Sequence, residues 1–578
     1  MINVESRNFK SNILILIVLA SFLTIFIRFY FLQINQNRKH NLKAGSNSIR
    51  KISLYAPRGI IYDRYNEPIV DNKPIYDLSI IPFDATDEFD YNGLSKIINF
   101  DSIKLKNQFL RLKESFYRFK PKVVKSHIDF ETRSIIEESK LRYPGLIFSE
   151  FPARTYPSSA RMTHVLGYLR IANDEILKES KNTNYQLGDV FGYSGIEKMY
   201  ESTLRGKDGI EYHLVDIYGI DHGIYSDFDP KQPIAGLPIF LTIDNELQGI
   251  IESELSNKVG AVICMNPNTG EVLAYASSPD YNLNSFTGPV PIDLWQEWKK
   301  DKKRPLLNRG IQGLYPPGST FKIIASAIGI EGNYVHPDWE VSCNGAYVFG
   351  DRTFHCWNEQ GHGKVNLNSA MKYSCNIYFY HLIQKIPFDK WYEICREFGF
   401  GSSTGIDLFN EKSGSVPNKL YMDNKYTTQG WAMGNLLNFV IGQGDILVTP
   451  IQILHMVNLV STKGNTFSPH LNKNIKRKEV KLSLKKETWE ILNNAMKDVV
   501  NSEDGTGKTA FIRNHDVHGK TGTAENPHGD DHSWFVGYLV KDNKLLVSTV
   551  VIIENGGKGS GIAADIAKTV FSYISKLK

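Results

Sequence analysis

The chain has 578 residues, of which 42% are hydrophobic and 22% charged, and its formal net charge is +5. This length predicts two or three domains, and the apolar fraction is sufficient for well-packed cores. The small net charge, without a basic arm or zinc-finger spacing, excludes nucleic acid as an expected partner.

An apolar segment lies near the N-terminus, at residues 13–32, with the sequence ILILIVLASFLTIFIRFYFL. Its length matches the roughly 30 Å hydrocarbon core of a bilayer. Arg28 is its only charged residue and lies near one end, where it can reach the interface. No small-residue cleavage site follows, so we expect an uncleaved single-pass anchor, with a buried core helix as the alternative. Cationic residues on both sides leave its orientation undecided.

The chain after position 236 alternates strand and helix patterns. We predict strands at 260–265, 271–276, 533–538 and 545–553, and helices at 247–255, 319–332 and 563–577. Strands joined by hairpins and interspersed with helices predict an α+β domain, in which helices cover an antiparallel sheet.

Three short motifs carry the chemistry. They are Ser319-Thr-Phe-Lys322, Ser374-Cys375-Asn376 and Lys520-Thr521-Gly522, in this order along the chain. Residues three apart share one helix face, so the Lys322 amine is expected to reach the Ser319 hydroxyl. A lysine can act as the base for a serine nucleophile only if its pKa is lowered by burial or by a nearby cation. Lys520 is a candidate for that cation.

With these motifs, nearly the whole chain resembles the class B penicillin-binding proteins, in particular the elongation-type penicillin-binding protein 2 group. The elongation type is favoured by Pro316-Pro317-Gly318, by Gly361-His362-Gly363 and by Ile441-Gly442-Gln443-Gly444. The resemblance implies a cytoplasmic tail and transmembrane anchor at 1–35 and a β-rich pedestal at 36–235, with a head inserted at about 85–150. It implies a transpeptidase domain at 236–578.

The resemblance implies that Ser319 attacks the D-alanyl-D-alanine carbonyl of a peptidoglycan stem peptide, with Lys322 as the base. Ser374 would relay a proton to the leaving amine, and Asn376 would hold the substrate amide and Lys322. The amine of a second stem peptide would then resolve the acyl-enzyme into a cross-link. β-Lactams would acylate the same serine, and no cofactor is required for this chemistry.

On the same resemblance, Lys520, Thr521, Gly522 and Thr523 would bind the terminal carboxylate of the substrate. The backbone N–H groups of Ser319 and Thr523 would form the oxyanion hole. The large domain would lie outside the cytoplasmic (inner) membrane, on the extracytoplasmic or periplasmic side. A SEDS-type (RodA-like) glycan polymerase is the implied partner.

Four residues are spaced as C-x12-C-x5-H-x12-C, namely Cys343, Cys356, His362 and Cys375. Three thiolates and one imidazole suit a structural tetrahedral zinc ion. Some relatives of the elongation type hold zinc here with carboxylates, a histidine and a cysteine, which His362 and Cys375 would match. His355 could be the ligand in place of His362. Two alternatives to a zinc site are a disulfide between Cys343 and Cys356 and cysteines that are plain buried apolar residues. We expect the other two cysteines, Cys264 and Cys395, to lie in the core.

Other functions remain open at this point. A β-lactamase uses the same motifs, although an anchor and a pedestal have no use in a small secreted hydrolase. A β-lactam sensor, or a non-catalytic activator of a glycan polymerase, is a further alternative. Modification of Ser319 by penicillin would separate these readings.

Overall fold

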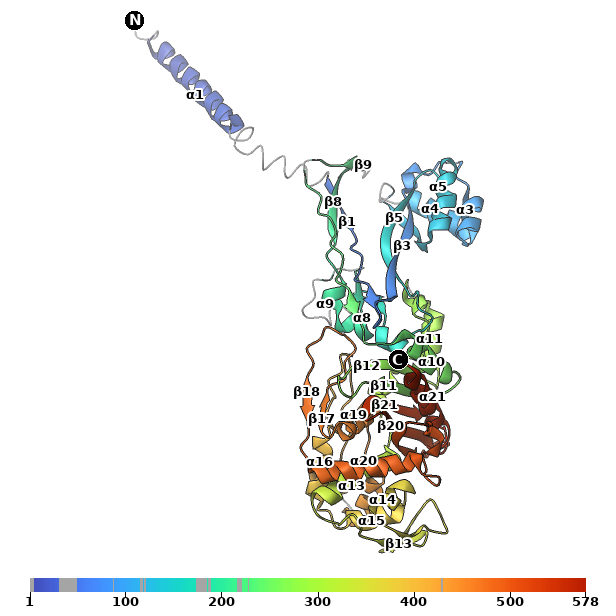
Figure 1. The fold of residues 1–578 in the computed structure, drawn as a ribbon. Coiled ribbons are helices and arrows are strands. Elements are labelled where there is room, and N and C mark those ends of the chain that lie inside the picture. Colours follow the sequence, from blue (N-terminus) through green and yellow to red (C-terminus); the bar gives the residue numbers. More distant parts are fainter. Residues whose placement is uncertain are drawn as a thin grey trace. The chain divides into compact units, whose positions relative to one another are not determined.

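The computed structural model describes residues 5–30, 49–86, 88–114, 118, 121–172, 185, 189–215, 221–226, 228–288, 290–427 and 430–577. The chain groups into two compact units, each assembled from stretches that are separated in sequence (Figure 1). The first unit contains residues 1–57, 73–153 and 206–235, and the second contains residues 58–72, 154–205 and 236–578.

The N-terminal apolar segment forms a single helix, α1 (Glu5–Tyr30). Its part from Ile13 to Tyr30 is long and apolar enough to cross a membrane, and none of it is buried inside the protein. The last two residues of the predicted anchor, Phe31 and Leu32, lie outside the described residues. By length and composition, α1 therefore fits the predicted single-pass anchor.

The first unit contains an antiparallel ribbon and a small α/β body. The ribbon consists of β1 (Ile49–Leu54), β8 (Gly209–Val215) and β9 (Asp221–Ile224). The small body consists of the end of β3 (Pro68–Ile80), β4 (Lys122–Ile128), β5 (Leu146–Thr155), α3 (Tyr91–Ile97), α4 (Ser102–Lys113) and α5 (Phe130–Glu138).

The three helices of this small body begin in the same way. Asp90, Asp101 and Asp129 precede α3, α4 and α5, and each carboxylate accepts a hydrogen bond from a backbone N–H of the first turn. Such caps satisfy donors that a helix start otherwise leaves unpaired. The helices bury their apolar faces, including Leu105 and Phe109, in a core separate from those of the second unit.

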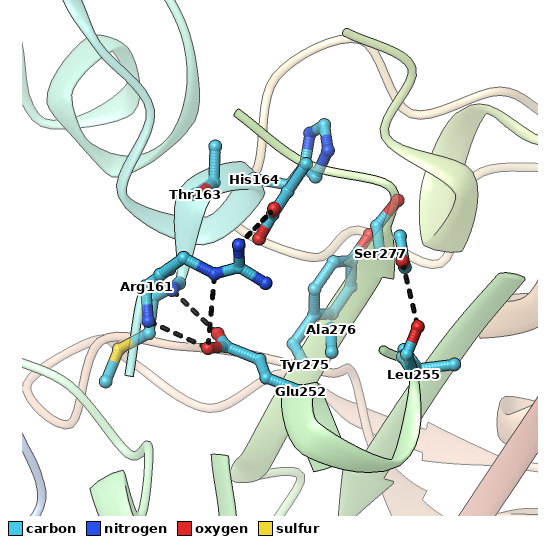
Figure 2. A pocket seen from close by; sticks show the side chains of 11 residues that line it. Arg161, Thr163, His164, Glu252, Leu255, Tyr275, Ala276 and Ser277 are labelled. Carbon is cyan, nitrogen blue, oxygen red and sulfur yellow. Dashed lines mark hydrogen bonds and ion pairs between the residues drawn. The ribbon is translucent and has the colours of Figure 1, made fainter. Parts of the chain in front are cut away.

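The second unit includes short helices and strands from residues 58–72 and 154–205 and from the start of its last stretch at residue 236. They are β2 (Ile61–Tyr62), α6 (Thr163–Leu166), β6 (Leu169–Ile171), β7 (Val190–Gly192), α8 (Gly195–Met199), α9 (Glu201–Leu204) and β10 (Ile239–Phe240). Glu252 links the residues just before α6 to the C-terminal part of this unit. Its carboxylate accepts hydrogen bonds from the backbone N–H groups of Arg161 and Met162, both at 2.8 Å. Arg161 also pairs with Asp280 at 3.0 Å. Figure 2 shows Arg161 beside Glu252.

A five-stranded antiparallel sheet forms the centre of the second unit. Its strand order is β12 (Val272–Ser278), β11 (Gly260–Met265), β21 (Lys544–Ile553), β20 (His532–Lys541) and β19 (Asp516–Ala524). Alternate side chains enter two different cores, as the two-residue period of a strand requires. Ile263 and Trp534 face one core, whereas Val262 and Phe535 face the other.

Helices cover both faces of this sheet (Figure 1). One face packs on α10 (Asn245–Glu254) and α21 (Ile562–Lys576). The other packs on α12 (Arg309–Gln312), α13 (Lys322–Glu331), α19 (Pro450–Ser461) and α20 (Lys486–Asn501). Beyond these lie α14 (Leu367–Lys372), α15 (Asn376–Ile383), α16 (Phe388–Glu397), α17 (Lys419–Lys425) and α18 (Met433–Val440).

The second unit also contains α11 (Ile292–Lys300) and three small two-stranded antiparallel sheets. These sheets pair β13 (Val341–Cys343) with β16 (Gly363–Val365), β14 (Ala346–Phe349) with β15 (Arg352–His355), and β17 (Asn465–Phe467) with β18 (Glu479–Lys481). The predicted α+β class and its antiparallel sheet are confirmed, with strand ends shifted by a few residues.

Candidate active site

The Ser319 segment begins with a tight turn instead of the predicted α-helix. Residues Gly318–Phe321 form a 3-10 turn, and the α-helix α13 starts only at Lys322. The Lys322 N–H donates back to the Ser319 carbonyl, which is the three-residue step of a 3-10 helix. Gly318 has a φ of +54°, so this residue cannot continue a right-handed helix backwards. The prediction of a helix from Ser319 was therefore wrong by one turn.

The turn is held by backbone contacts with two distant segments. The Gly318 N–H donates to the Gly442 carbonyl at 2.9 Å. A Cβ atom at Gly442 would lie 2.2 Å from the Gly318 oxygen, and one at Gly318 would lie 2.5 Å from the Thr523 oxygen. Gln443 completes the contact, because its Nε2 donates to the Thr523 carbonyl at 3.2 Å. Only glycine fits at both positions, so the turn position depends on the bare backbone.

The three predicted motifs meet at the Ser374 hydroxyl. Lys520 Nζ lies 2.9 Å from Ser374 Oγ, and Lys322 Nζ lies 3.2 Å from it. Lys322 Nζ also donates to the Ser374 carbonyl at 2.8 Å and to Asn376 Oδ1 at 2.7 Å. One hydroxyl therefore lies between two amines that the sequence separates by almost 200 residues.

Both amines are buried without a carboxylate partner among the described residues. Lys322 and Lys520 are each 0% exposed. Burial lowers the pKa of Lys322 to about 8, and the negative charge of nearby thiolates opposes this shift. Burial also lowers the pKa of Lys520 well below its ordinary value, and the charge of Lys322 lowers it further. A buried amine of low pKa is available as a base near neutral pH.

Ser319 itself is only partly buried. Within the part of the chain that the structure describes, its hydroxyl forms no hydrogen bond, because the Lys322 amine is directed to Ser374 and Asn376. The expected Ser319–Lys322 side-chain contact is therefore not formed in this state. Hydrogen bonds of a catalytic group often tighten only when the substrate is bound.

Ser374 occupies a strained position between two helices. Its φ is +55°, a left-handed conformation that is rare for a residue other than glycine. Ser374 lies between α14 and α15, where the Cys375 N–H donates to the Ala370 carbonyl at 2.9 Å. The turn points the Ser374 hydroxyl at both amines, and such strain persists only when surrounding contacts maintain it.

The Lys520 motif lies on β19, beside the Ser319 turn. Gly522 allows close packing there, because a Cβ atom would lie 2.9 Å from Thr320 Cγ2. Thr521 Oγ1 lies 3.2 Å from the hydroxyl of Thr506, a residue that sequence reasoning missed. Thr506 lies in a loop between two glycines, and this pattern alone carries no chemical signal.

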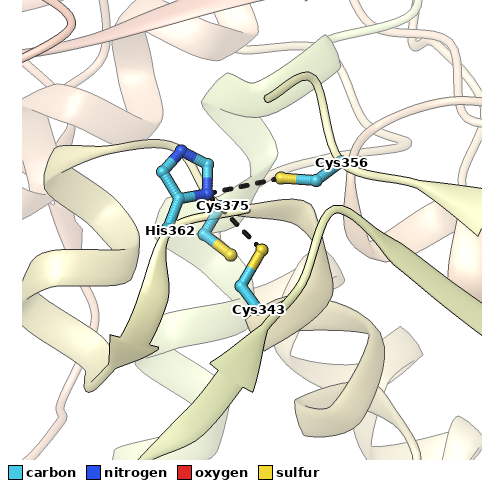
Figure 3. Close-up of side chains that lie close together, drawn as sticks. All are labelled: Cys343, Cys356, His362 and Cys375. Atoms are coloured by element: carbon cyan, nitrogen blue, oxygen red, sulfur yellow. Dashed lines mark hydrogen bonds between the residues drawn. The ribbon is translucent and has the colours of Figure 1, made fainter. Parts of the chain in front are cut away.

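The four predicted metal ligands come together behind Ser374. The Sγ atoms of Cys343, Cys356 and Cys375 and one ring nitrogen of His362 all lie within 4.8 Å of one another. Figure 3 shows the four side chains gathered in one place. His362 Nδ1 is 3.5 Å from the sulfurs of Cys343 and Cys356. His355 is not part of this group.

These residues fit a tetrahedral metal. Zn–S bonds of about 2.3 Å and Zn–N bonds of about 2.0 Å place ligand atoms roughly 3.5 to 3.8 Å apart. All four cysteine and histidine side chains are buried or half-buried, and every cysteine of the chain is a free thiol. The Cys375 thiol donates a hydrogen bond towards the sulfur of Cys356. This interaction lowers the pKa of Cys356 and raises the pKa of Cys375. A divalent cation would neutralise the negative charge of these clustered thiolates.

The group is directly connected to the second motif. Cys356 Sγ accepts a hydrogen bond from the Asn376 N–H at 3.4 Å, and the His355 carbonyl accepts from Asn376 Nδ2 at 3.2 Å. The predicted core cysteines, Cys264 in β11 and Cys395 in α16, are fully buried elsewhere.

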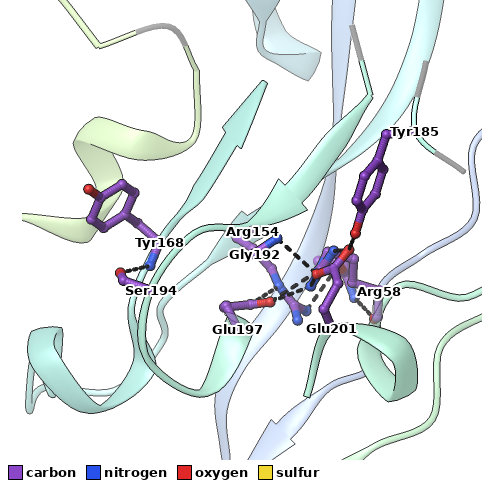
Figure 4. A network of polar contacts seen from close by, with 9 residues as sticks. Arg58, Arg154, Tyr168, Tyr185, Gly192, Ser194, Glu197 and Glu201 are labelled. Atoms are coloured by element: carbon purple, nitrogen blue, oxygen red, sulfur yellow. Dashed lines mark hydrogen bonds and ion pairs between the residues drawn. The ribbon is translucent and has the colours of Figure 1, made fainter. Parts of the chain in front are cut away.

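A buried ionic network joins the segments around Arg58, Arg154 and Glu197 in the second unit (Figure 4). Arg58 Nη2 lies 2.7 Å from Glu197 and 2.6 Å from Glu201, and Arg154 Nε lies 2.7 Å from Glu197. Burial alone would raise the pKa of Glu197, but the two guanidinium groups lower it below its ordinary value. Three of these four side chains are almost fully enclosed, so loss of one partner would leave a buried unpaired charge.

Two family models match the chain. The penicillin binding protein transpeptidase domain matches residues 260–572, and the penicillin-binding protein dimerisation domain matches residues 53–239. The chain belongs to the penicillin-binding protein transpeptidase family. The first match contains all twelve predicted site residues, and the second contains Arg58 and Glu197 of the ionic network.

Individual relatives agree with the assignment to penicillin-binding proteins. The chain is 31% identical to the peptidoglycan D,D-transpeptidase MrdA of Haemophilus influenzae, over 95% of this chain and 89% of that protein. It is 27% identical to MrdA of Escherichia coli strain K12, over 92% and 89% of the two chains. A solved structure of PBP2 from Helicobacter pylori with MreC has a TM-score of 0.79 and 28% identity, covering 91% of this chain and 99% of that one.

Proposed function

We propose that this penicillin-binding protein cross-links the stem peptides of peptidoglycan through a serine acyl-enzyme during cell elongation. The convergence of Lys322 and Lys520 on the Ser374 hydroxyl, beside the Ser319 turn, is the observation that carries this proposal. The MrdA relatives, which match over nine-tenths of the chain, support the same reaction.

In the first step the Ser319 oxygen attacks the carbonyl of the terminal D-alanyl-D-alanine bond, and its proton passes to Lys322. The C–N bond then breaks, D-alanine leaves with a proton delivered through Ser374, and an ester to Ser319 remains. In the second step the amine of another stem peptide displaces Ser319 and forms the cross-link. Water in place of that amine would give a residual D,D-carboxypeptidase activity, and a β-lactam would form a stable ester.

The other site residues position the substrate. Asn376 holds Lys322 through its Oδ1 and leaves part of its amide for the peptide backbone. Lys520, Thr521 and Thr523 would bind the terminal carboxylate, and Gly522 would let Thr523 approach the Ser319 turn. The N–H groups of Ser319 and Thr523 would stabilise the oxyanion, a contribution of about 3 kcal/mol per donor in other acyl transferases.

Labelling with a fluorescent penicillin tests this function. The wild-type chain should form a stable covalent adduct, and peptide mapping should find it on Ser319. The Ser319→Ala variant should remain unlabelled although it melts at the wild-type temperature. An adduct on another residue would refute the acyl-enzyme assignment, and rapid loss of the label would indicate a β-lactamase.

We further propose that Cys343, Cys356, His362 and Cys375 hold one structural zinc ion. Four protein ligands leave no open coordination position, so the ion would supply no catalytic water and would hold the Ser374 turn. Metal analysis of the protein purified under reducing conditions should find about one zinc per chain. A substoichiometric trace of metal, or a Cys343–Cys356 disulfide, would reject this site.

The remaining proposals concern the domains of the chain, its orientation in the membrane and its partner. We propose a tail and anchor at 1–35, a pedestal at 36–235 with a head at about 85–150, and a transpeptidase domain at 236–578 on the extracytoplasmic side. A SEDS-type glycan polymerase is the proposed partner. This is supported by a solved chain from a peptidoglycan synthase complex that coordinates polymerization and crosslinking, which matches 98% of this chain with a TM-score of 0.74. Protease protection in spheroplasts would test the orientation, because a protected C-terminal domain would contradict it.

A further inference from the structure

The second unit contains a cavity of about 200 Å³ that is separate from the Ser319 site. It is lined by the segment that follows β7 and by the segment that leads into α12. The pocket beside Arg161 and Glu252 (Figure 2) has a volume of about 10 Å³, enough for about one water molecule. The larger cavity can therefore admit a small organic ligand, whereas the smaller one cannot.

Aromatic rings form one side of this cavity. The rings of Tyr168 and Tyr193 stack with centroids 5.5 Å apart, and Tyr281 meets Tyr168 edge to face at 5.9 Å. The Arg170 guanidinium also lies 4.5 Å from the centroid of the Tyr193 ring, so a ligand can reach only the 37% of Tyr193 that remains exposed. Rigid tyrosine rings offer flat apolar faces together with hydroxyl groups, and this combination suits a ligand with both C–H faces and polar edges.

The ammonium group of Lys198 lies near two of the aromatic rings. Lys198 Nζ lies 3.8 Å from the centroid of the Phe409 ring and 5.6 Å from that of Tyr193. It forms no ion pair with any carboxylate among the described residues. Partial burial lowers its pKa, which shows that part of its hydration is lost without a compensating charge. An anionic group on a ligand would provide that charge.

Two polar side chains around the cavity have nitrogen atoms without a hydrogen-bond partner among the described residues. Gln312 Oε1 accepts from the Asn308 N–H at 3.3 Å, and the two Nε2 hydrogens of Gln312 have no acceptor in the described chain. His164 also lines the cavity, and its Nε2 is buried without a hydrogen-bond partner among the described residues. Ser194 Oγ is already used, because it accepts from the Tyr168 N–H (Figure 4). The Gln312 amide therefore offers a donor to an acceptor group on a ligand.

We propose that this cavity binds the glycan portion of peptidoglycan, as an N-acetylated amino sugar with a carboxylate-bearing peptide stub. The pyranose would pack on Tyr193, the carboxylate would pair with Lys198, and the acetamido carbonyl would accept from Gln312. This inference rests on the proposed function, since that reaction uses stem peptides attached to such sugars. Binding here would hold a glycan strand on the same unit that carries Ser319.

Binding of N-acetylmuramyl-L-alanyl-D-isoglutamine to the full chain in detergent micelles, measured by calorimetry, tests the proposal. Lys198→Met and Tyr193→Ala should each weaken binding about tenfold, equivalent to 1.4 kcal/mol. Lys198→Arg, which keeps the charge, should retain binding. Lys385→Met is the matched control, because Lys385 also lies over an aromatic ring, that of Trp339, but outside this cavity.

The sugar itself is tested with tri-N-acetylchitotriose, which lacks the carboxylate. It should bind more weakly than the muramyl probe and should be insensitive to Lys198→Met. Equal binding of the muramyl probe to wild type, Lys198→Met and Tyr193→Ala would overturn the proposal, as would binding of the free alanyl-isoglutamine peptide with the affinity of the muramyl probe. Ser319→Ala should bind the probe normally while losing penicillin labelling, so the acyl-enzyme and the sugar site can fail independently.

Discussion

The two walls of the active site are held in position by different means. The Ser319 turn is pinned by backbone contacts, in which Gly318 packs between Gly442 and Thr523 without any side chain. The Ser374 turn is instead supported from behind by the thiol of Cys356, which accepts from the Asn376 N–H. One wall therefore tolerates no added atom, whereas the other depends on the chemical state of cysteines. This difference predicts that the two walls will respond to different perturbations.

The largest expected effect comes from the amine that joins the two walls. Lys322→Met keeps the length of the side chain and removes the base, so acylation by penicillin should slow by about 10²–10⁴-fold. The free energy of unfolding should not fall, because the variant no longer buries an amine. Stopped-flow labelling and thermal melting measure the two quantities. Acylation within tenfold of wild type would exclude Lys322 as the base.

Gly442→Ala breaks the Ser319 wall alone. Its φ of +72° and a Cβ only 2.2 Å from the Gly318 oxygen together should lower the free energy of unfolding by about 3 kcal/mol or more. Acylation should slow as the turn moves.

Gly350→Ala is the matched control for strain without a clash, since Gly350 has a φ of +63° and nothing within 4 Å of an added Cβ. It should cost about 1 kcal/mol by denaturant unfolding and leave acylation unchanged. Equal destabilisation by the two substitutions would show that the close contact with Gly318 does not affect the free energy of unfolding.

Cys356→Ser breaks the Ser374 wall alone. Loss of one of the four proposed ligands should lower the affinity for zinc by more than the roughly 10–100-fold that loss of an outer-shell partner costs. Acylation should fall with it, because Asn376 loses the sulfur acceptor. Cys264→Ser is the control, since Cys264 is equally buried but contacts only Thr549 among polar side chains of the described chain. Normal acylation by a metal-free Cys356→Ser protein would show that the Ser374 turn does not need the group.

The smallest effect is the pH dependence of acylation. The neutral form of Lys322 is the competent base, and its pKa is lowered to about 8. The acylation rate should therefore rise with pH through about 8 and fall about tenfold per pH unit well below it. A rate independent of pH between 6 and 9 would assign the base to another group.

Much of the site is visible in the order of motifs along the chain. Ser319, Ser374 and Lys520 were predicted as one centre, and the structure brings the amines of Lys322 and Lys520 within hydrogen-bond distance of the Ser374 hydroxyl. Four of the five strands of the central sheet were also predicted, because long apolar runs bounded by turn residues are local signals, whereas β19, which carries the Lys520 motif, was missed. The start of α13 was misplaced, since the 3-10 turn at Ser319 depends on a contact with Gly442 more than 120 residues away.

The sequence by itself determined the residue types, their order and the family, because these depend on spacing and side-chain chemistry. Only the tertiary structure decided that Lys322 donates to Ser374 and Asn376 instead of Ser319, that Ser374 is held at φ +55°, and that His362 joins the three thiols where His355 does not. These features arise from packing between distant segments, where burial sets the pKa values and where close backbone contacts set the geometry.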